Sequence, residues 1–100
     1  MKRVSTLLKT LPQVQNFTSH NGNDVPNQYE IRTQDGRVFQ SYSSIIAIVT
    51  NDGRTIVDTY KYDYSKTTMK YLCDFLRLDS IKEVRALIDS GSILTANLNK

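Results

Sequence analysis

The fold of this chain is decided by residues 60–91, which read YKYDYSKTTMKYLCDFLRLDSIKEVRALIDSG. At the start of this stretch, tyrosines at positions 60, 62 and 64 alternate with polar residues, a period of two that is typical of a β-strand. Beyond Tyr64 the apolar residues recur at the three- and four-residue spacing of an α-helix. The same spacing resumes after Asp79 and ends at Gly91. The stretch therefore predicts a junction between a β-sheet and a pair of helices.

Capping residues support both predicted helices. Ser65 can accept a hydrogen bond from a free N–H group in the first turn of the first helix, and Asp79 or Ser80 can do so for the second. Glu83 follows Ser80 by three residues, which is the spacing of a capping box. Because only a few residues separate the helices, we expect a tight corner between them.

Upstream of the junction, the pattern predicts an antiparallel meander with strands over residues 29–33, 37–42, 45–50 and 54–61. Asp35-Gly36 predicts a hairpin turn, because this pair tolerates positive φ at both turn positions. Asn51-Asp52-Gly53 predicts a second hairpin turn. Ser43-Ser44 interrupts the pattern as a bulge, a bend or a turn, so the meander has either three long strands or four short ones. Residues 45–50 form an apolar run that is typical of a strand buried on both sides.

We expect one domain over residues 29–100, preceded by an N-terminal part over residues 1–28. Residues 2–10 predict a short amphipathic helix that ends before Pro12. Residues 13–28 are rich in amide and turn residues and predict a loop. The tail over residues 93–99 is expected to fold back as an edge strand. The predicted fold class is α+β: an antiparallel meander of three or four strands followed by two short helices packed on one face.

The composition is that of a folded intracellular protein. The 100 residues are 39% hydrophobic and 23% charged, and they carry a formal net charge of +3 with both signs interleaved. No apolar run approaches the roughly 18 residues of a membrane span, and Lys9 interrupts the only N-terminal apolar pair. The single cysteine, Cys73, excludes an internal disulfide and is typical of a reducing cytosol. We therefore expect a cytoplasmic location and no membrane partner.

The tyrosines at 60, 62 and 64 are the first candidate binding residues. If they share one face of a strand, they could stack nucleotide bases or line a ligand pocket. The alternative is that they form the apolar contact between the sheet and the helices. We favour this second interpretation, because a sheet that carries two helices needs a large apolar face.

A second candidate surface consists of the basic residues of the helix pair. If the helices formed a helix-turn-helix, these side chains would contact nucleic acid. They are Lys66, Lys70, Arg77, Lys82 and Arg85. Against this reading, Glu83 and Asp89 lie on the second helix, where they would repel phosphates.

Catalytic and cofactor sites are not expected. The only histidine, His20, has no sequence relation to Cys73, which lies among apolar helix residues as free cysteines commonly do. One cysteine, one histidine and scattered carboxylates do not form a metal motif, and no glycine-rich phosphate loop is present. We therefore expect a protein that is not an enzyme and has no cofactor.

Four segments resemble a known family. They are F-Q-S-Y…I-A at Phe39–Ala47, Y-S-x-T-T-x-K-Y at Tyr64–Tyr71, and Gly-x-Ile with Asn-Leu-Asn at residues 91–93 and 97–99. With this spacing, residues 37–99 resemble a family of small uncharacterised proteins encoded by tailed bacteriophages. The resemblance implies a viral origin and action in the cytoplasm of an infected bacterium. It implies no activity and no site residues.

We therefore expect a non-enzymatic bacteriophage accessory protein that binds a host or phage protein. The candidate surfaces are a strand edge, the Asn-rich loop predicted over residues 13–28, and any tyrosines left uncovered. A homodimer through a strand edge or a helix face is a further expectation. Two alternatives stay open: a nucleic-acid-binding regulator that uses the helix pair, and a small-ligand or nucleotide-binding protein with a tyrosine-lined pocket.

Overall fold

A computed structural model describes residues 13–19 and 21–99. The helix predicted over residues 2–10 lies outside this part of the chain, and so does His20. In chain order the described elements are β1 (Gln13–Thr18), β2 (Asp24–Thr33), β3 (Gly36–Ser41), β4 (Ser44–Thr50), β5 (Thr55–Asp58), α2 (Lys66–Leu76), α3 (Ile81–Ser90) and β6 (Ile93–Ala96).

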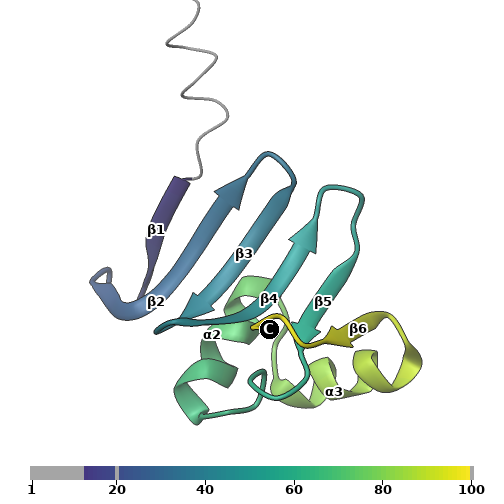
Figure 1. Ribbon diagram of the computed structural model, residues 1–100. Helices are drawn as coiled ribbons and strands as arrows, with labels where there is room; N and C mark the ends of the chain where they lie inside the picture. The colour runs from purple at the N-terminus through teal and green to yellow at the C-terminus, as the bar shows by residue number, and fades with distance from the viewer. Residues whose placement is uncertain (1–12, 20, 100) are drawn as a thin grey trace, which may run out of the picture.

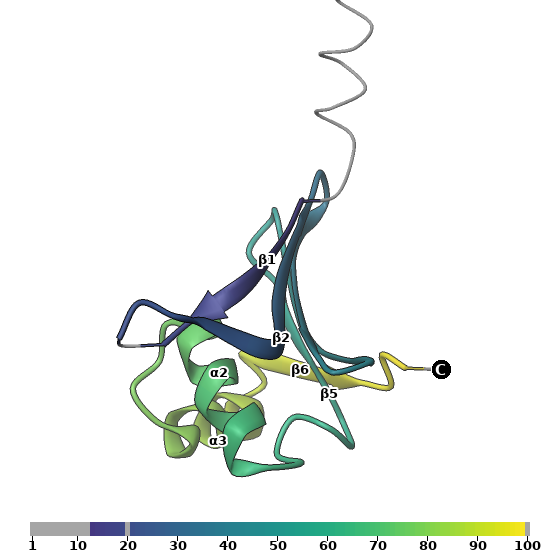
Figure 2. The same ribbon diagram turned by 90° about the vertical axis from the view of Figure 1, so that its left-hand side faces the viewer.

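The strands form one sheet in the order β1-β2-β3-β4-β5-β6 (Figure 1). The first five strands pair antiparallel as a meander, and β6 pairs parallel with β5. A parallel partner requires a long crossover, and α2 and α3 supply it. Both helices lie on the same face of the sheet (Figure 2). The predicted α+β class is confirmed, although the sheet has more strands than the three or four expected.

The N-terminal edge of the sheet corrects one prediction. Residues 13–28 were expected to form a loop, but β1 pairs with β2 from Gln13↔Arg32 to Thr18↔Asp24. Phe17 of β1 packs against the hydrophobic core, so the sheet begins at Gln13 and not at residue 29. The polar composition of residues 13–18 did not indicate a strand, because most side chains of this edge strand face water.

The end of β5 corrects a second prediction. Tyr60, Tyr62 and Tyr64 do not belong to a strand, because β5 ends at Asp58 and the chain then turns. The buried Asp58 carboxylate explains the turn: it accepts hydrogen bonds from Tyr60 N at 3.1 Å and from Leu98 N at 2.7 Å.

The Tyr42-Ser43 turn settles the number of strands in the meander. Ser41 pairs with Ser44 across these two residues, and Tyr42 adopts a φ of 54°. Four separate strands, β2 to β5, therefore occupy the region where three or four were predicted. The predicted tail strand is confirmed as β6.

The core lies between the sheet and the helices. The rings of Phe39 and Phe75, which are almost fully buried, have centroids 5.8 Å apart. The neighbouring residues Ile46 and Ala47 both belong to this core, because a bulge shifts the register between the pairs Phe39↔Ala47 and Gln40↔Ile45. No helix or strand in the part of the chain that the structure describes covers the other face of β4, so the prediction of a strand buried on both sides is wrong.

Candidate functional site

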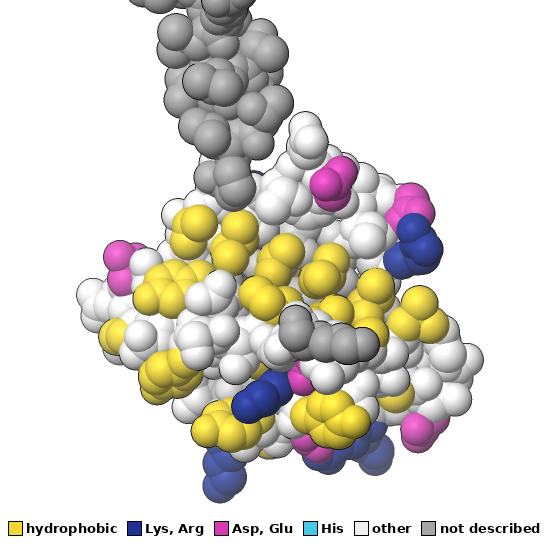
Figure 3. All heavy atoms as spheres, in the orientation of Figure 1, with side chains coloured by type: hydrophobic (Ala, Val, Ile, Leu, Met, Phe, Trp, Pro, Cys, Tyr) yellow, Lys and Arg dark blue, Asp and Glu magenta, His cyan; other side chains and the backbone are white. Residues whose placement is uncertain are grey.

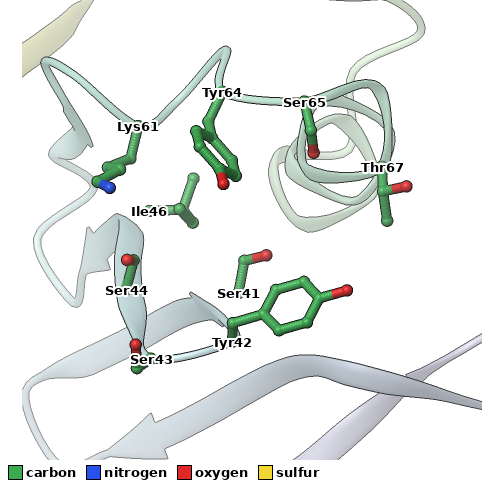
Figure 4. A pocket seen from close by; sticks show the side chains of 9 residues that line it. All are labelled: Ser41, Tyr42, Ser43, Ser44, Ile46, Lys61, Tyr64, Ser65 and Thr67. Atoms are coloured by element: carbon green, nitrogen blue, oxygen red, sulfur yellow. The ribbon is translucent and has the colours of Figure 1, made fainter.

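A pocket of about 530 Å³ lies between the β3–β4 turn and the start of α2 (Figure 4). Seven of its nine lining side chains end in a hydroxyl group, and we call it the hydroxyl pocket. It is lined by Ser41, Tyr42, Ser43, Ser44, Ile46, Lys61, Tyr64, Ser65 and Thr67.

The β3–β4 turn places Tyr42 at the mouth of the pocket. Tyr42 N donates to Asn27 O at 2.7 Å, and Gln40 Nε2 donates to Tyr42 O at 2.7 Å. These bonds fix the backbone of Tyr42 in the left-handed conformation, which a residue with a side chain adopts rarely. As a result the Tyr42 side chain projects outward and is 61% exposed.

Hydroxyl groups connect the two elements that enclose the pocket. Ser65 Oγ accepts from Thr68 N at 3.1 Å, which caps α2, and donates to Thr68 Oγ1 at 3.0 Å. Thr68 Oγ1 lies 3.4 Å from Ser41 Oγ at the end of β3. Thr68 and Ser41 are both buried. The bond between Thr68 and Ser41 therefore joins the N-terminus of α2 to β3 and forms the base of the pocket.

Tyr64 and Lys61 form the wall opposite the turn. Lys61 Nζ lies 5.2 Å from the centre of the Tyr64 ring, within the range of a cation–π contact. Tyr64 is 68% exposed, and its ring points toward the β3–β4 turn (Figure 4). Two exposed aromatic rings, several hydroxyls and one ammonium group can thus contact a molecule that enters the pocket.

The three predicted tyrosines have three different environments. Tyr64 lines the pocket, Tyr60 is 71% exposed outside it, and Tyr62 is half-buried against the core. The interpretation that all three form the contact between the sheet and the helices is therefore wrong for Tyr60 and Tyr64, and it holds for Tyr62. Their period-two spacing has no structural counterpart, because the segment is a series of turns.

The predicted basic residues are interspersed with acids. Lys66 and Lys70 of α2 line a shallow hollow beside α3 together with Asp74 and Asp79. Arg85 lies 3.8 Å from Asp63, and Lys70 contacts the ring of Tyr71 at 5.3 Å. The remaining two predicted basic residues, Arg77 and Lys82, are both exposed. Arg77 caps the C-terminus of α2, whereas Lys82 lies in the first turn of α3 beside Glu83.

Cys73 lies outside the pocket and is buried. Burial raises the pKa of its thiol, and the negative charges of Asp74 and Glu83 raise it further. The thiol is therefore protonated, and weakly nucleophilic, at neutral pH.

Two further classes of site are absent from the part of the chain that the structure describes. Among residues 13–19 and 21–99, no three His, Cys, Asp or Glu side chains gather closely enough to hold a metal ion. Within the same residues, no helix is both long and apolar enough to cross a membrane.

Of the nine residues that line the hydroxyl pocket, only Tyr64 was a predicted site residue. Tyr42 was predicted as the last residue of a strand, and Ser43 as part of the break that follows it. A signal was nevertheless present, because the segments Phe39–Ala47 and Tyr64–Tyr71 had been singled out together as motifs. The structure brings these two segments together at the pocket.

Residues 8–91 match a protein family described as "Family of unknown function (DUF8033)", and the chain belongs to this family. No curated protein and no solved structure gives a significant match to the chain.

Proposed function

We propose that this DUF8033 protein is a non-enzymatic bacteriophage accessory protein that binds a host or phage protein through the hydroxyl pocket. The observation that carries the proposal is the pair of exposed rings, Tyr42 and Tyr64, beside a recess of serine and threonine hydroxyls. Tyrosine supplies a large contact area with few rotatable bonds, and serine adapts its hydrogen bonds to the partner. For these reasons recognition surfaces are rich in both.

The rigidity of the pocket supports binding. The left-handed turn at Tyr42 and the hydroxyl chain from Ser65 to Ser41 hold both walls before a partner arrives. Little conformational entropy is then lost on association. A short peptide segment suits the site, with one apolar side chain between the rings and backbone groups bonded to the hydroxyls. The phage origin and the host cytoplasm as the place of action rest on the resemblance of residues 37–99 to the bacteriophage family.

The first experiment is affinity capture from bacterial lysate with the tagged full chain, with and without nuclease treatment. We expect a host or phage protein that survives nuclease. The Tyr42→Ser, Tyr64→Ser double variant should bind it at least about 30-fold more weakly, as expected for aromatic hot spots worth about 2 kcal/mol or more. Tyr60→Ser is the matched control, because Tyr60 is equally exposed but outside the pocket.

Equal capture by the double variant and the control would contradict the proposal. Capture of nucleic acid alone, with an affinity that falls steeply with salt, would instead favour the basic residues of the helix pair.

The size of the pocket favours one alternative, a small ligand. A volume of about 530 Å³ falls within the range of small-molecule sites, roughly 300 to 1,000 Å³. A nucleotide or another metabolite with an aromatic ring would stack on Tyr64 and bond to the hydroxyls. Such a ligand would raise the unfolding temperature of the wild type but not that of the Tyr42→Ser, Tyr64→Ser variant.

A further inference from the structure

The helix-free face of the sheet carries an unbroken row of aliphatic side chains. Each strand contributes one residue, and each residue pairs with its neighbour on the next strand. We call these residues the aliphatic row: Val14, Ile31, Val38, Ile48, Ile56 and Leu94. Hydrophobic side chains form a band across the strands on this face (Figure 3).

The aliphatic row is not part of the core. None of its members belongs to the buried cluster or packs against it. Its ends are open to water, with Val14 61% and Leu94 47% exposed, and its four inner members are half-buried. A contiguous apolar patch of this kind is typical of an interaction surface.

The two rows that flank the aliphatic row contain no charged residue. The flanking rows are Asn16–Tyr29–Gln40–Ile45 and Thr33–Gly36–Thr50. Glu30, Arg32 and Arg37 of β2 and β3 lie on the other face, where Glu30 pairs with Arg32 at 2.8 Å and with Arg37 at 3.1 Å. Asp58 is buried where the tail crosses the sheet and Asn99 bonds to the backbone of Ile45. Three rows without charge do not repel a copy of themselves.

The face is large enough for an interface between two copies. Neighbouring strands are about 4.8 Å apart, so the row is about 24 Å long. The flanking rows lie about 7 Å to either side along the strands, so the three rows together cover on the order of 500 Å². Two such faces in contact would bury about 1,000 Å² in total, the lower bound for a specific interface.

We infer that the aliphatic row is the interface of a homodimer in which two sheets stack face to face. A two-fold axis in the plane between the sheets maps an aliphatic row onto an aliphatic row, so the surface is its own complement. Sheets that stack in this way lie about 10 Å apart. This surface is separate from the hydroxyl pocket, so the inference does not depend on the proposed function. Val38 and Ile48 are the central pair, and the two copies of position 38 therefore lie close to the axis.

Sedimentation equilibrium of the full chain tests this inference. At about 100 µM, well above a micromolar dissociation constant, the wild type should have twice the monomer mass of 11.4 kDa. Val38→Lys and Val38→Glu should each have the monomer mass, because like charges meet at the axis. An equimolar mixture of the two variants should regain the double mass, because lysine then faces glutamate. This rescue would also show that both variants fold.

Ala86 provides the control, because it is exposed on α3, on the opposite side of the sheet. Ala86→Lys and Ala86→Glu should keep the double mass, both alone and mixed. A wild type that is monomeric at every concentration would overturn the inference. So would Val38 variants that stay dimeric, or a mixture that stays monomeric. If residues 1–12 or a foreign protein covered the aliphatic row instead, the mixture would stay monomeric, because neither brings two copies of position 38 together.

Discussion

At the scale of single residues, Gly36 lies at a hairpin as predicted, but the reason that glycine is required there differs from the predicted one. The pair Asp35-Gly36 does mark a hairpin, since Thr33 pairs with Gly36 across two residues. Asp35, however, has no positive φ. Glycine is needed at position 36 because a Cβ atom there would lie 2.2 Å from Val49 O, and because its φ is 151°. The close approach of β4, and not the turn alone, therefore requires glycine at position 36.

Replacing this glycine should therefore be severe. Gly36→Ala is expected to lower the free energy of unfolding by about 3 kcal/mol or more, because backbone must move to admit the methyl group. Gly53→Ala should cost only about 1 kcal/mol, since position 53 also has a positive φ but has open space around it. Urea unfolding of both variants measures the difference. Similar losses in the two variants would show that the close approach to Val49 is absent.

At the scale of elements, α2 and α3 are the best-predicted parts of the protein. Ser65 and Ser80 cap them as expected, and Gly91 ends α3 with a φ of 84°. Arg77 ends α2 in the left-handed conformation and donates its N–H to the carbonyls of the last turn. Nothing in the sequence marks this cap, because glycine or asparagine normally occupies it.

The two N-caps should differ in strength. Ser65→Ala is expected to lower the free energy of unfolding by about 1 to 2 kcal/mol, because the half-buried Ser65 hydroxyl bonds both Thr68 N and Thr68 Oγ1. Ser80→Ala should cost about 0.5 to 1 kcal/mol, since Ser80 is exposed and its bond to Glu83 N is longer, at 3.4 Å. Thermal or urea unfolding of both variants gives the comparison, and an equal or reversed order would contradict it.

At the scale of the whole molecule, β1 decides where the folding unit begins. One face of β1 contacts the core, and the other face lies on the helix-free side of the sheet. The ring of Phe17 lies 5.1 Å from that of Phe39 and 5.6 Å from that of Tyr71, between the sheet and the helices. Val14, on the other face, belongs to the aliphatic row. If β1 is part of the cooperative unit, its core-facing side chain must contribute to global stability.

Phe17→Ala is accordingly expected to lower the free energy of unfolding by about 2 to 3 kcal/mol, somewhat below the loss for a fully buried phenylalanine. Val14→Ala, on the same strand, should change it by less than about 0.5 kcal/mol. Both are measured at low protein concentration, so that association through the aliphatic row does not contribute. A negligible effect of Phe17→Ala would place residues 13–18 outside the folding unit.

The candidate site combines residues from several elements, and only part of it was predicted from the sequence. Tyr64 was identified, although as one of three equivalent tyrosines on a strand. Tyr42, Ser43 and Ser44 were not identified, because their role depends on a turn facing the start of a helix more than 20 residues away. Local patterns carry no signal for such a contact.

Local patterns in the sequence were sufficient to predict the α+β class, the helix pair with its serine caps, and the hairpins. These features depend on interactions between residues close in the chain, or on a period that one segment carries alone. The tail strand was predicted from its apolar residues, but its parallel pairing with β5 is a long-range contact. Only the tertiary structure decided that residues 13–18 form a strand, that β5 ends at Asp58, and which apolar face stays uncovered. The physical reason is that these features depend on distant partners. The bond from Leu98 N to the Asp58 carboxylate spans 40 residues, and the aliphatic row exists only when six strands align in one register.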